Sequence, residues 1–269
     1  MQASSASRPW GALIAADFGK TSADYARYRP GFPSSFFQRL AAHGVGCAGQ
    51  RILDLGTGTG TLARGFAQTG AAAVGLDVSA NQIDAAAKLD REAGVRVEYV
   101  VGRAEATGLS AAAFDIVVAG QCWHWFDSAA AMAEAARLLK PDGRLVICHF
   151  DWLPLSGNVV EATEQLIAAH NPAWRFFGGH GIYPQWAVDA GRAGYRNLEI
   201  FAYDHAQRAS HESWRGRIRA SAGVGASLSP AAVAKFDAEL AALLRTRFPA
   251  EPLEVPHRVF AMIAKRPPA

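Results

Sequence analysis

The residues best suited to chemistry lie in the stretch 51–61, RILDLGTGTGT. An apolar run ends in Asp54, and glycines follow at alternating positions, Gly56, Gly58 and Gly60. Glycine lets the backbone approach a ligand with no Cβ in the way, and the start of a following helix presents unpaired N–H groups. A buried strand, a glycine turn and a helix in this order are typical of the nucleotide-binding corner of an α/β fold. The pattern therefore predicts a cofactor site.

The spacing of the glycines indicates which cofactor. A dinucleotide fingerprint, G-x-G-x-x-G, needs a third glycine where this chain has Thr61. The observed pattern, D-x-G-x-G-x-G, resembles the first motif of the class I S-adenosylmethionine-dependent methyltransferases. The cofactor of that family has no phosphates and carries an ammonium, which a carboxylate such as Asp54 can hold. The resemblance implies S-adenosyl-L-methionine as cofactor and S-adenosyl-L-homocysteine as product.

Candidate site residues also follow three further predicted strands. The segment 71–79 ends near Asp77, about 20 residues beyond the glycines, where a carboxylate can accept hydrogen bonds from both ribose hydroxyls. The segment 95–109 contains a strand followed by Gly-Arg-Ala-Glu, and the strand in 113–126 runs into polar and aromatic residues. Ligands of open parallel sheets lie at the carboxyl ends of the strands, so we expect these positions to converge in space.

The methyltransferase resemblance assigns a cofactor contact to ten positions of this chain. They are Asp54, Gly56, Thr57, Gly58, Gly60, Asp77, Val78, Ala104, Glu105 and Gln121. Asp77 would bind the ribose, Val78 would pack on the adenine, and Gln121 would face the methionine part or the acceptor. Many relatives carry an acid just before the alanine, where this chain has Arg103. A contact to the adenine amino group would therefore come from Glu105 or from the backbone.

Two further segments resemble the trans-aconitate methyltransferase group within the type 11 methyltransferases. One is YARYRPGFP (25–33), which in that group folds over the cofactor as a lid, and which also suits packing of the arm onto the core. The other is His-Trp-Phe at 124–126. His124 is the candidate general base, since a neutral imidazole can take a proton from a hydroxyl or an amine; the alternative is a structural hydrogen-bonding role. The expected acceptor pocket contains Tyr25, Arg29, Trp125, His149, Tyr183 and Arg219.

The expected fold is α/β, with a doubly wound, mostly parallel seven-stranded sheet of the Rossmann-like methyltransferase type and a helical cap. The resemblance implies that the last strand is antiparallel. We expect a helical lid or arm over 1–44, a cofactor-binding core over 45–152, and cap helices with the remaining strands over 153–269, all in one compact catalytic domain. Lys140-Pro141-Asp142-Gly143 predicts a compact turn before a fifth strand over 143–152.

The composition and charge of the chain indicate which classes of partner to expect. The 269 residues are 50% hydrophobic and 19% charged, as in ordinary soluble enzymes, and no uncharged run approaches the about 18 residues of a membrane span. Residues 1–8 lack a signal-peptide pattern, so we expect a cytoplasmic protein with no membrane partner. The three cysteines lack a C-x-x-C pair, and Cys122-x-His124 lacks further ligands, so no metal is expected. The net charge is only +3, and we expect a small-molecule acceptor, no nucleic acid, and a monomer or homodimer.

Other functions fit parts of the same pattern. The favoured reading is methyl transfer to an oxygen, nitrogen or carboxylate of a small metabolite. The same fold could methylate RNA or protein. A nicotinamide oxidoreductase is disfavoured by Thr61 at the place of the third glycine. A protein that binds the cofactor without turnover would also keep Asp54 and Asp77.

Overall fold

The computed structural model describes residue 28 and residues 31–268. Within this part of the chain a sheet of seven strands runs in the order β3-β2-β1-β4-β5-β7-β6. The strands are β1 Arg51–Leu55, β2 Ala72–Asp77, β3 Glu98–Val101, β4 Phe114–Gly120, β5 Leu139–Trp152, β6 Arg196–Ala209 and β7 Leu253–Lys265. Strands β1 to β5 pair in parallel, whereas β7 lies antiparallel between β5 and β6. The predicted mostly parallel sheet with an antiparallel last strand is confirmed.

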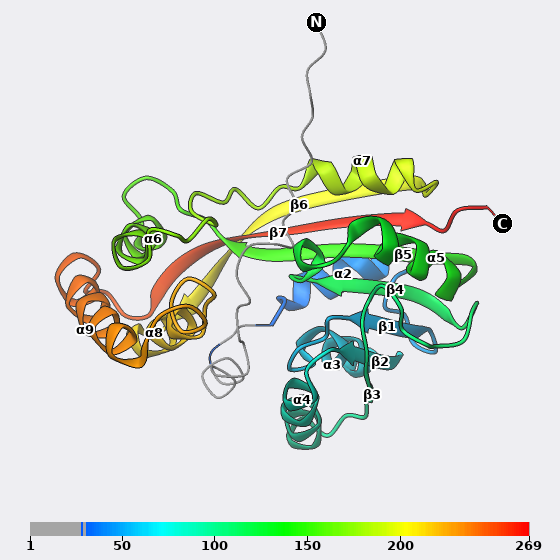
Figure 1. Cartoon of the computed structure of the whole chain (residues 1–269), viewed down its shortest axis with the longest axis horizontal. Coiled ribbons are helices and arrows are strands. Elements are labelled where there is room, and N and C mark those ends of the chain that lie inside the picture. Colours follow the sequence, from blue (N-terminus) through cyan, green and yellow to red (C-terminus); the bar gives the residue numbers. More distant parts are fainter. Residues whose placement is uncertain (1–27, 29–30, 269) are drawn as a thin grey trace, which may run out of the picture.

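Helices cover both faces of the sheet (Figure 1). They are α2 Ser34–Ala42, α3 Thr61–Gln68, α4 Ala80–Ala93, α5 Ser128–Leu138, α6 Val159–His170, α7 Pro184–Arg192, α8 His211–Arg219 and α9 Pro230–Arg247. Helices α2 and α3 bury Phe36 and Phe66 against one face, and α5 and α7 bury Met132 and Trp186 against the other. The central strands are buried on both faces, which is why β1 reads as a nearly unbroken apolar run.

The order of the strands creates the place for a ligand. The chain moves outward from β1 through β2 to β3 and then returns to β4 on the other side of β1. Consecutive connections therefore leave the sheet in opposite directions beside the carboxyl ends of β1 and β4, and open α/β sheets bind their ligands at such a point.

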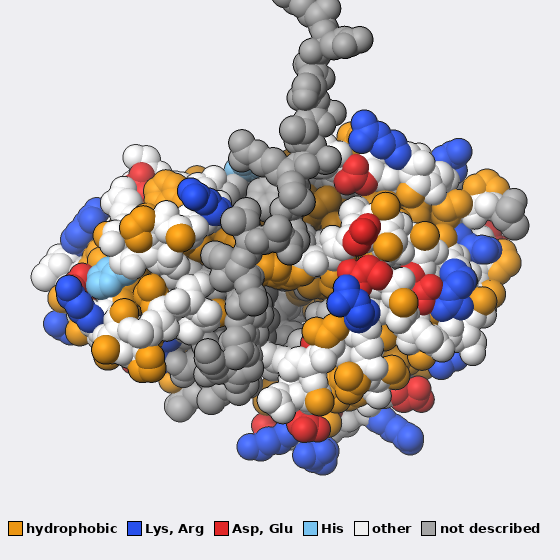
Figure 2. Space-filling model, viewed as in Figure 1, with side chains coloured by type: hydrophobic (Ala, Val, Ile, Leu, Met, Phe, Trp, Pro, Cys, Tyr) orange, Lys and Arg blue, Asp and Glu red, His pale blue; other side chains and the backbone are white. Residues whose placement is uncertain are grey.

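The strands β5, β6 and β7 are more than twice as long as β1 and extend beyond the central sheet (Figure 1). Their far ends carry a cap made of α6, α8 and α9, whose apolar core is separate from the clusters on the sheet. Trp214, Ile218, Phe236 and Leu240 are fully buried in that core. The surface is hollowed between the cap and the central sheet (Figure 2). The domain boundaries at residues 44 and 152 stay predictions.

The predicted compact turn at 140–143 is wrong, because these residues belong to β5. Phe114 pairs with Leu139, and Ile116 pairs with Arg144, so β5 advances five residues while β4 advances two. The additional residues form a bulge, in which Pro141 has no N–H to leave unpaired. The sequence signal of a turn is real, but here it marks an irregularity inside a strand.

Candidate active site

The glycine loop joins β1 to α3 at the carboxyl edge of the sheet. Gly56, Gly58 and Gly60 have φ of 65°, 56° and 74°, in the left-handed region that favours glycine. A Cβ on Gly56 would lie 2.9 Å from Sγ of Cys122 and 3.1 Å from Cζ of Phe126. The loop therefore needs glycine both for its backbone conformation and for its close approach to the residues that follow β4.

Asp77 ties the glycine loop to the next helix. Its Oδ2 accepts a hydrogen bond from the N–H of Gly58 at 2.8 Å, and its Oδ1 accepts one from the N–H of Ser79 at 2.9 Å. Ser79 in turn caps α4 through its side chain. Val78, between the two, has an exposed fraction of 67%, unusual for a large apolar residue. A half-buried carboxylate beside an exposed apolar side chain suits a ribose and a base.

Asp54 is a buried carboxyl group below the same loop. It is only 2% exposed and accepts a hydrogen bond from Oγ1 of Thr57 at 2.6 Å. Burial raises the pKa of Asp54 to about 7, against the lowering effect of hydrogen bonds from Thr57 and from the N–H of Ala63, and the charge of Asp77 raises it further. A cation placed nearby would stabilise the ionised form, so the group is matched to an ammonium.

Arg64, Asp90 and Tyr99 form a hydrogen-bonded brace for the glycine loop, which the sequence analysis did not predict. Nε of Arg64 donates to Oδ1 of Asp90 at 2.7 Å, and the Tyr99 hydroxyl donates to Oδ2 of Asp90 at 2.8 Å. Arg64 also donates from Nη2 to the carbonyl of Thr59, inside the loop, at 2.8 Å. The available signal was that Asp90 lies on the same helical face as buried Gln82 and Ala86, eight and four residues earlier.

The predicted adenine contacts have other partners. Ala104 is buried, and Glu105 accepts a hydrogen bond at Oε1 from the N–H of Asp127 at 3.2 Å. Oε2 of Glu105 lies 3.4 Å from Nη2 of Arg103. Glu105 thus links the loop after β3 to the start of α5, and its contact with adenine stays a prediction.

Gln121 joins the ends of β4 and β5. Its N–H donates to the carbonyl of Cys148 at 2.9 Å, and its Nε2 donates to the carbonyl of Phe150 at 2.7 Å. Its φ is 59°, a strained conformation for a residue other than glycine. Strained residues of this kind are often found at functional sites.

The structure brings four of the predicted acceptor-site residues together. His124, in the short 3-10 helix η3 Trp123–Trp125, has its ring centroid 4.7 Å from that of Trp125 and 5.5 Å from that of His149. The His149 ring lies 4.6 Å from the Tyr183 ring. Asp151, two residues after His149, accepts a hydrogen bond from the Tyr183 hydroxyl at 2.6 Å. A polar and aromatic cluster therefore stands at the ends of β4 and β5.

Asp151 is ionised within this cluster. Burial alone would raise its pKa, but the electrostatic influence of His149, the hydrogen bonds from His149 and Tyr183, and the electrostatic influence of His124 outweigh burial, and the pKa of Asp151 is below its ordinary value. Burial and the neighbouring Asp151 carboxylate raise the pKa of Tyr183, which therefore stays a hydrogen-bond donor.

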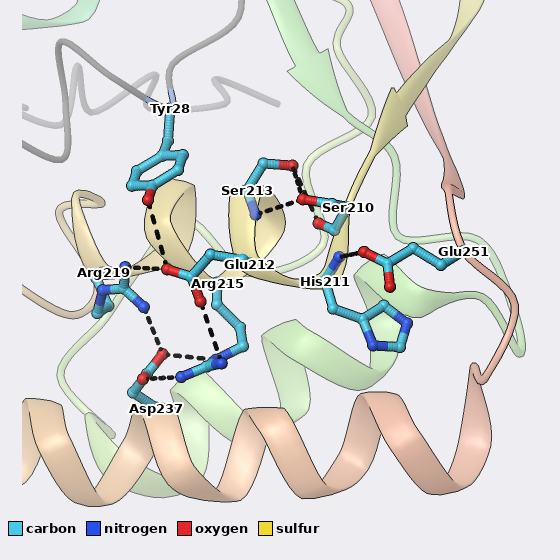
Figure 3. A network of polar contacts seen from close by, with 9 residues as sticks. All are labelled: Tyr28, Ser210, His211, Glu212, Ser213, Arg215, Arg219, Asp237 and Glu251. Atoms are coloured by element: carbon cyan, nitrogen blue, oxygen red, sulfur yellow. Dashed lines mark hydrogen bonds and ion pairs between the residues drawn. The ribbon is translucent and has the colours of Figure 1, made fainter.

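Arg219 lies in a polar network of the cap (Figure 3). Its Nη1 donates to Asp237 and its Nη2 donates to Glu212, both at 2.9 Å. The Tyr28 hydroxyl donates to Glu212 at 3.5 Å, and the Arg219 guanidinium lies 6.0 Å from the centre of the Tyr28 ring. The structure thus assigns Arg219 to the packing of α8 on α9, and its role in acceptor binding stays a prediction. The predicted pocket residues Tyr25 and Arg29 lie outside the described residues.

The described part of the chain has neither a metal-binding cluster nor a helix that could span a membrane. No group of three or more His, Cys, Asp or Glu side chains there could hold a metal ion. None of the helices there has the length and apolar character needed to cross a membrane.

The comparisons with known proteins agree with this geometry. Residues 53–147 match the family described as a methyltransferase domain. These residues are a methyltransferase domain. The family takes its methyl group from S-adenosylmethionine, so the predicted enzyme class and cofactor are confirmed at the level of this domain. The narrower trans-aconitate assignment stays a prediction.

Individual relatives extend the likeness of the domain to the whole fold. An uncharacterized methyltransferase of Mycobacterium tuberculosis is 35% identical over 128 residues, which cover 48% of this chain and 49% of that protein. A putative type II methyltransferase from Anaeromyxobacter dehalogenans has a TM-score of 0.63 at 21% identity, covering 90% of this chain and all of that one. Phosphoethanolamine N-methyltransferase 2 of Haemonchus contortus, bound to S-adenosylhomocysteine and phosphomonomethylethanolamine, has a TM-score of 0.55 at 22% identity, with 91% and 57% covered. The chain spans about half the length of the first curated relatives that it matches.

Proposed function

We propose that this protein transfers a methyl group from S-adenosylmethionine to an oxygen, nitrogen or carboxylate of a small molecule. The observation that carries the proposal is Asp77, whose carboxylate is tied to the N–H groups of Gly58 and Ser79 at the carboxyl edge of the sheet. On the face in Figure 2 the described Lys and Arg side chains are scattered among Asp and Glu side chains. The modest net charge of +3 gives little support to a nucleic-acid substrate.

The residues present fit S-adenosylmethionine. Gly56 keeps the loop close to the residues that follow β4, since a Cβ there would fall 2.9 Å from Sγ of Cys122. Buried Asp54, with its pKa of about 7, suits the ammonium of the methionine part. Asp77 suits the ribose hydroxyls, and the exposed Val78 suits the adenine. Each part of the cofactor therefore has a group of matching chemistry on one of two neighbouring strand ends.

The chemistry asks the protein mainly for positioning. When bound, S-adenosylmethionine supplies a sulfonium methyl group that is already electrophilic. Holding the acceptor atom about 3 Å from that carbon, in line with the departing sulfur, supplies much of the rate acceleration. An acceptor that is already a carboxylate or a free amine needs no base, whereas a hydroxyl needs one. His124, in η3 after β4, would serve as that base.

Two measurements test the proposal. Calorimetry should show that the chain binds S-adenosylhomocysteine and does not bind NAD. Incubation of the chain with S-adenosylmethionine and a metabolite extract, followed by mass spectrometry, should show a product heavier by one methyl group. Asp77→Ala is the loss variant, and Asp84→Ala, on the exposed face of α4, is the matched control. A chain that fails to bind S-adenosylhomocysteine would refute the proposal.

A further inference from the structure

Three polar side chains form a group next to His124, whose ring centroid lies 5.5 Å from that of His149. His149 and Asp151 come from the end of β5, and Tyr183 precedes α7. The Tyr183 hydroxyl donates to Oδ2 of Asp151 at 2.6 Å, and Nδ1 of His149 lies 3.4 Å from Oδ1 of the same carboxylate. The three form a chain of polar contacts that leads from α7 to the ring beside His124.

The arrangement determines which nitrogen of His149 carries the proton. An ionised Asp151 accepts hydrogen bonds, so the neutral imidazole has its N–H at Nδ1 and a lone pair at Nε2. His149 is only 3% exposed, and its Nε2 is buried with no hydrogen-bond partner in the described part of the chain. A buried polar atom without a partner is costly and calls for an explanation, such as a catalytic role.

The groups around His149 define the charge of this cluster. Asp151 and Tyr183 contact it, the Trp186 ring lies 4.8 Å away, and His124 is its neighbour at 5.5 Å. His257 belongs to the opposite face of the sheet, where its ring packs on Phe150. The cluster therefore holds one carboxylate and two imidazoles, and a proton received there would be balanced by Asp151. A carboxylate acceptor would instead be repelled.

Aromatic side chains lie next to the His124 end of this cluster. The Phe176 ring lies 5.8 Å from His124 and 6.1 Å from Trp125. Phe176 and Phe177 are 39% and 52% exposed, although large apolar side chains are usually covered. The Phe176 and Trp125 rings suit a planar apolar molecule next to His124.

We infer that the acceptor is a phenol-like hydroxyl compound that loses its proton to His124, and that His149, Asp151 and Tyr183 are positioning residues for this transfer. The inference rests on the proposed function. The acceptor O–H bond breaks and its proton goes to the imidazole of His124. The oxygen lone pair forms the new bond to the methyl carbon, while the carbon–sulfur bond breaks and its electron pair stays on sulfur as a thioether.

The test uses the full chain loaded with S-adenosylhomocysteine and 4-nitrophenol as probe, at a pH below the pKa of the free phenol. The ionised probe absorbs at longer wavelength, so its absorbance reports proton loss without turnover. We expect the wild type to bind and ionise the probe. His149→Gln and Asp151→Asn should lower the ionisation constant of the bound probe about tenfold, the effect of one pKa unit. Tyr183→Phe should give a smaller decrease, because its ring keeps its stack on Trp186.

Controls separate this inference from the proposed function. Calorimetry with S-adenosylhomocysteine should give wild-type affinity for every variant, and His170→Gln, on the cap against Glu239, should ionise the probe like the wild type. A wild-type protein that binds S-adenosylhomocysteine but leaves the probe neutral or unbound overturns the inference and leaves the proposed function standing. Equal ionisation by all variants also overturns the role of the three residues. Should His149→Gln fail to fold, Tyr183→Phe decides the matter.

Discussion

At the scale of single residues, the site depends on acids held in different protonation states by their surroundings. Asp54 and Asp151 are both buried carboxyl groups, but Asp151 is surrounded by histidines and a tyrosine hydroxyl, whereas Asp54 has Asp77 nearby. The pKa is therefore raised for Asp54 and lowered for Asp151. This difference matches their proposed roles, because Asp54 is completed by a cation from the ligand and Asp151 already has its partners.

The raised pKa of Asp54 predicts a pH dependence of stability. Its pKa rises from 3.8 to about 7 on folding, so the folded state binds the proton more tightly than the unfolded state. The wild type should therefore lose stability relative to Asp54→Asn as the pH rises from about 4 to about 7, by a few kcal/mol in total. Urea denaturation of both proteins across this range measures the difference. A difference that does not change with pH would contradict the raised pKa.

His124→Ala tests the base directly. The variant should keep its affinity for S-adenosylhomocysteine, since the cofactor groups lie on β1 and β2, and lose about 100-fold or more in the rate of methyl transfer to a hydroxyl acceptor. Calorimetry and a mass-spectrometric rate assay provide the two numbers. His180→Ala, in the loop before α7, is the matched histidine control. A variant that methylates at the wild-type rate would reduce His124 to a structural role.

At the scale of elements, the glycine loop needs glycine for two separate reasons, its left-handed backbone conformation and its close contact with neighbouring side chains. Gly56 and Gly94 share a left-handed backbone, with φ of 65° and 67°. A Cβ on Gly56 would meet Cys122 and Phe126, whereas a Cβ on Gly94 would meet nothing within 4 Å. Substitutions at Gly94 therefore measure backbone strain alone, whereas substitutions at Gly56 measure backbone strain together with steric crowding.

Gly94→Ala should cost about 1 kcal/mol of stability and leave S-adenosylhomocysteine affinity unchanged. Gly56→Ala should cost more, about 2 to 3 kcal/mol, because a neighbour must also move, and it should weaken binding at least tenfold. Thermal unfolding and calorimetry of the two variants give the comparison. Equal losses in both proteins would mean that contact with Cys122 is unimportant.

At the scale of the whole molecule, the long strands β5, β6 and β7 join two apolar cores. One end of these strands belongs to the sheet that carries the cofactor groups, and the other end belongs to the cap. The acceptor cluster of His149 and Asp151 stands between them on β5. We therefore expect changes in the cap to affect acceptor binding more than cofactor binding.

Leu240→Ala and Leu53→Ala test this division, because both side chains are fully buried, one in the cap and one in β1. Each should destabilise the chain by about 2 to 5 kcal/mol through the cavity that it leaves. Leu240→Ala should leave the affinity for S-adenosylhomocysteine within about twofold, whereas Leu53→Ala, next to Asp54, should lower it. Calorimetry well below the unfolding temperature of each variant measures the two affinities for S-adenosylhomocysteine. Loss of binding in Leu240→Ala would show that the cap helps to hold the cofactor.

The resemblance to methyltransferases implied the seven-stranded sheet. The sequence by itself determined the strand, glycine loop and helix around Asp54 and the position of the acid Asp77. These features depend on residues that are adjacent in the sequence, because the backbone conformation at Gly56 and the apolar run of β1 follow from local sterics and burial. Only the tertiary structure decided that Arg64, Asp90 and Tyr99 brace the loop, that Arg219 pairs with Asp237 in the cap, and that Tyr183 reaches Asp151. Such partners lie 9 to 32 residues apart along the chain, and packing and strand register bring them together.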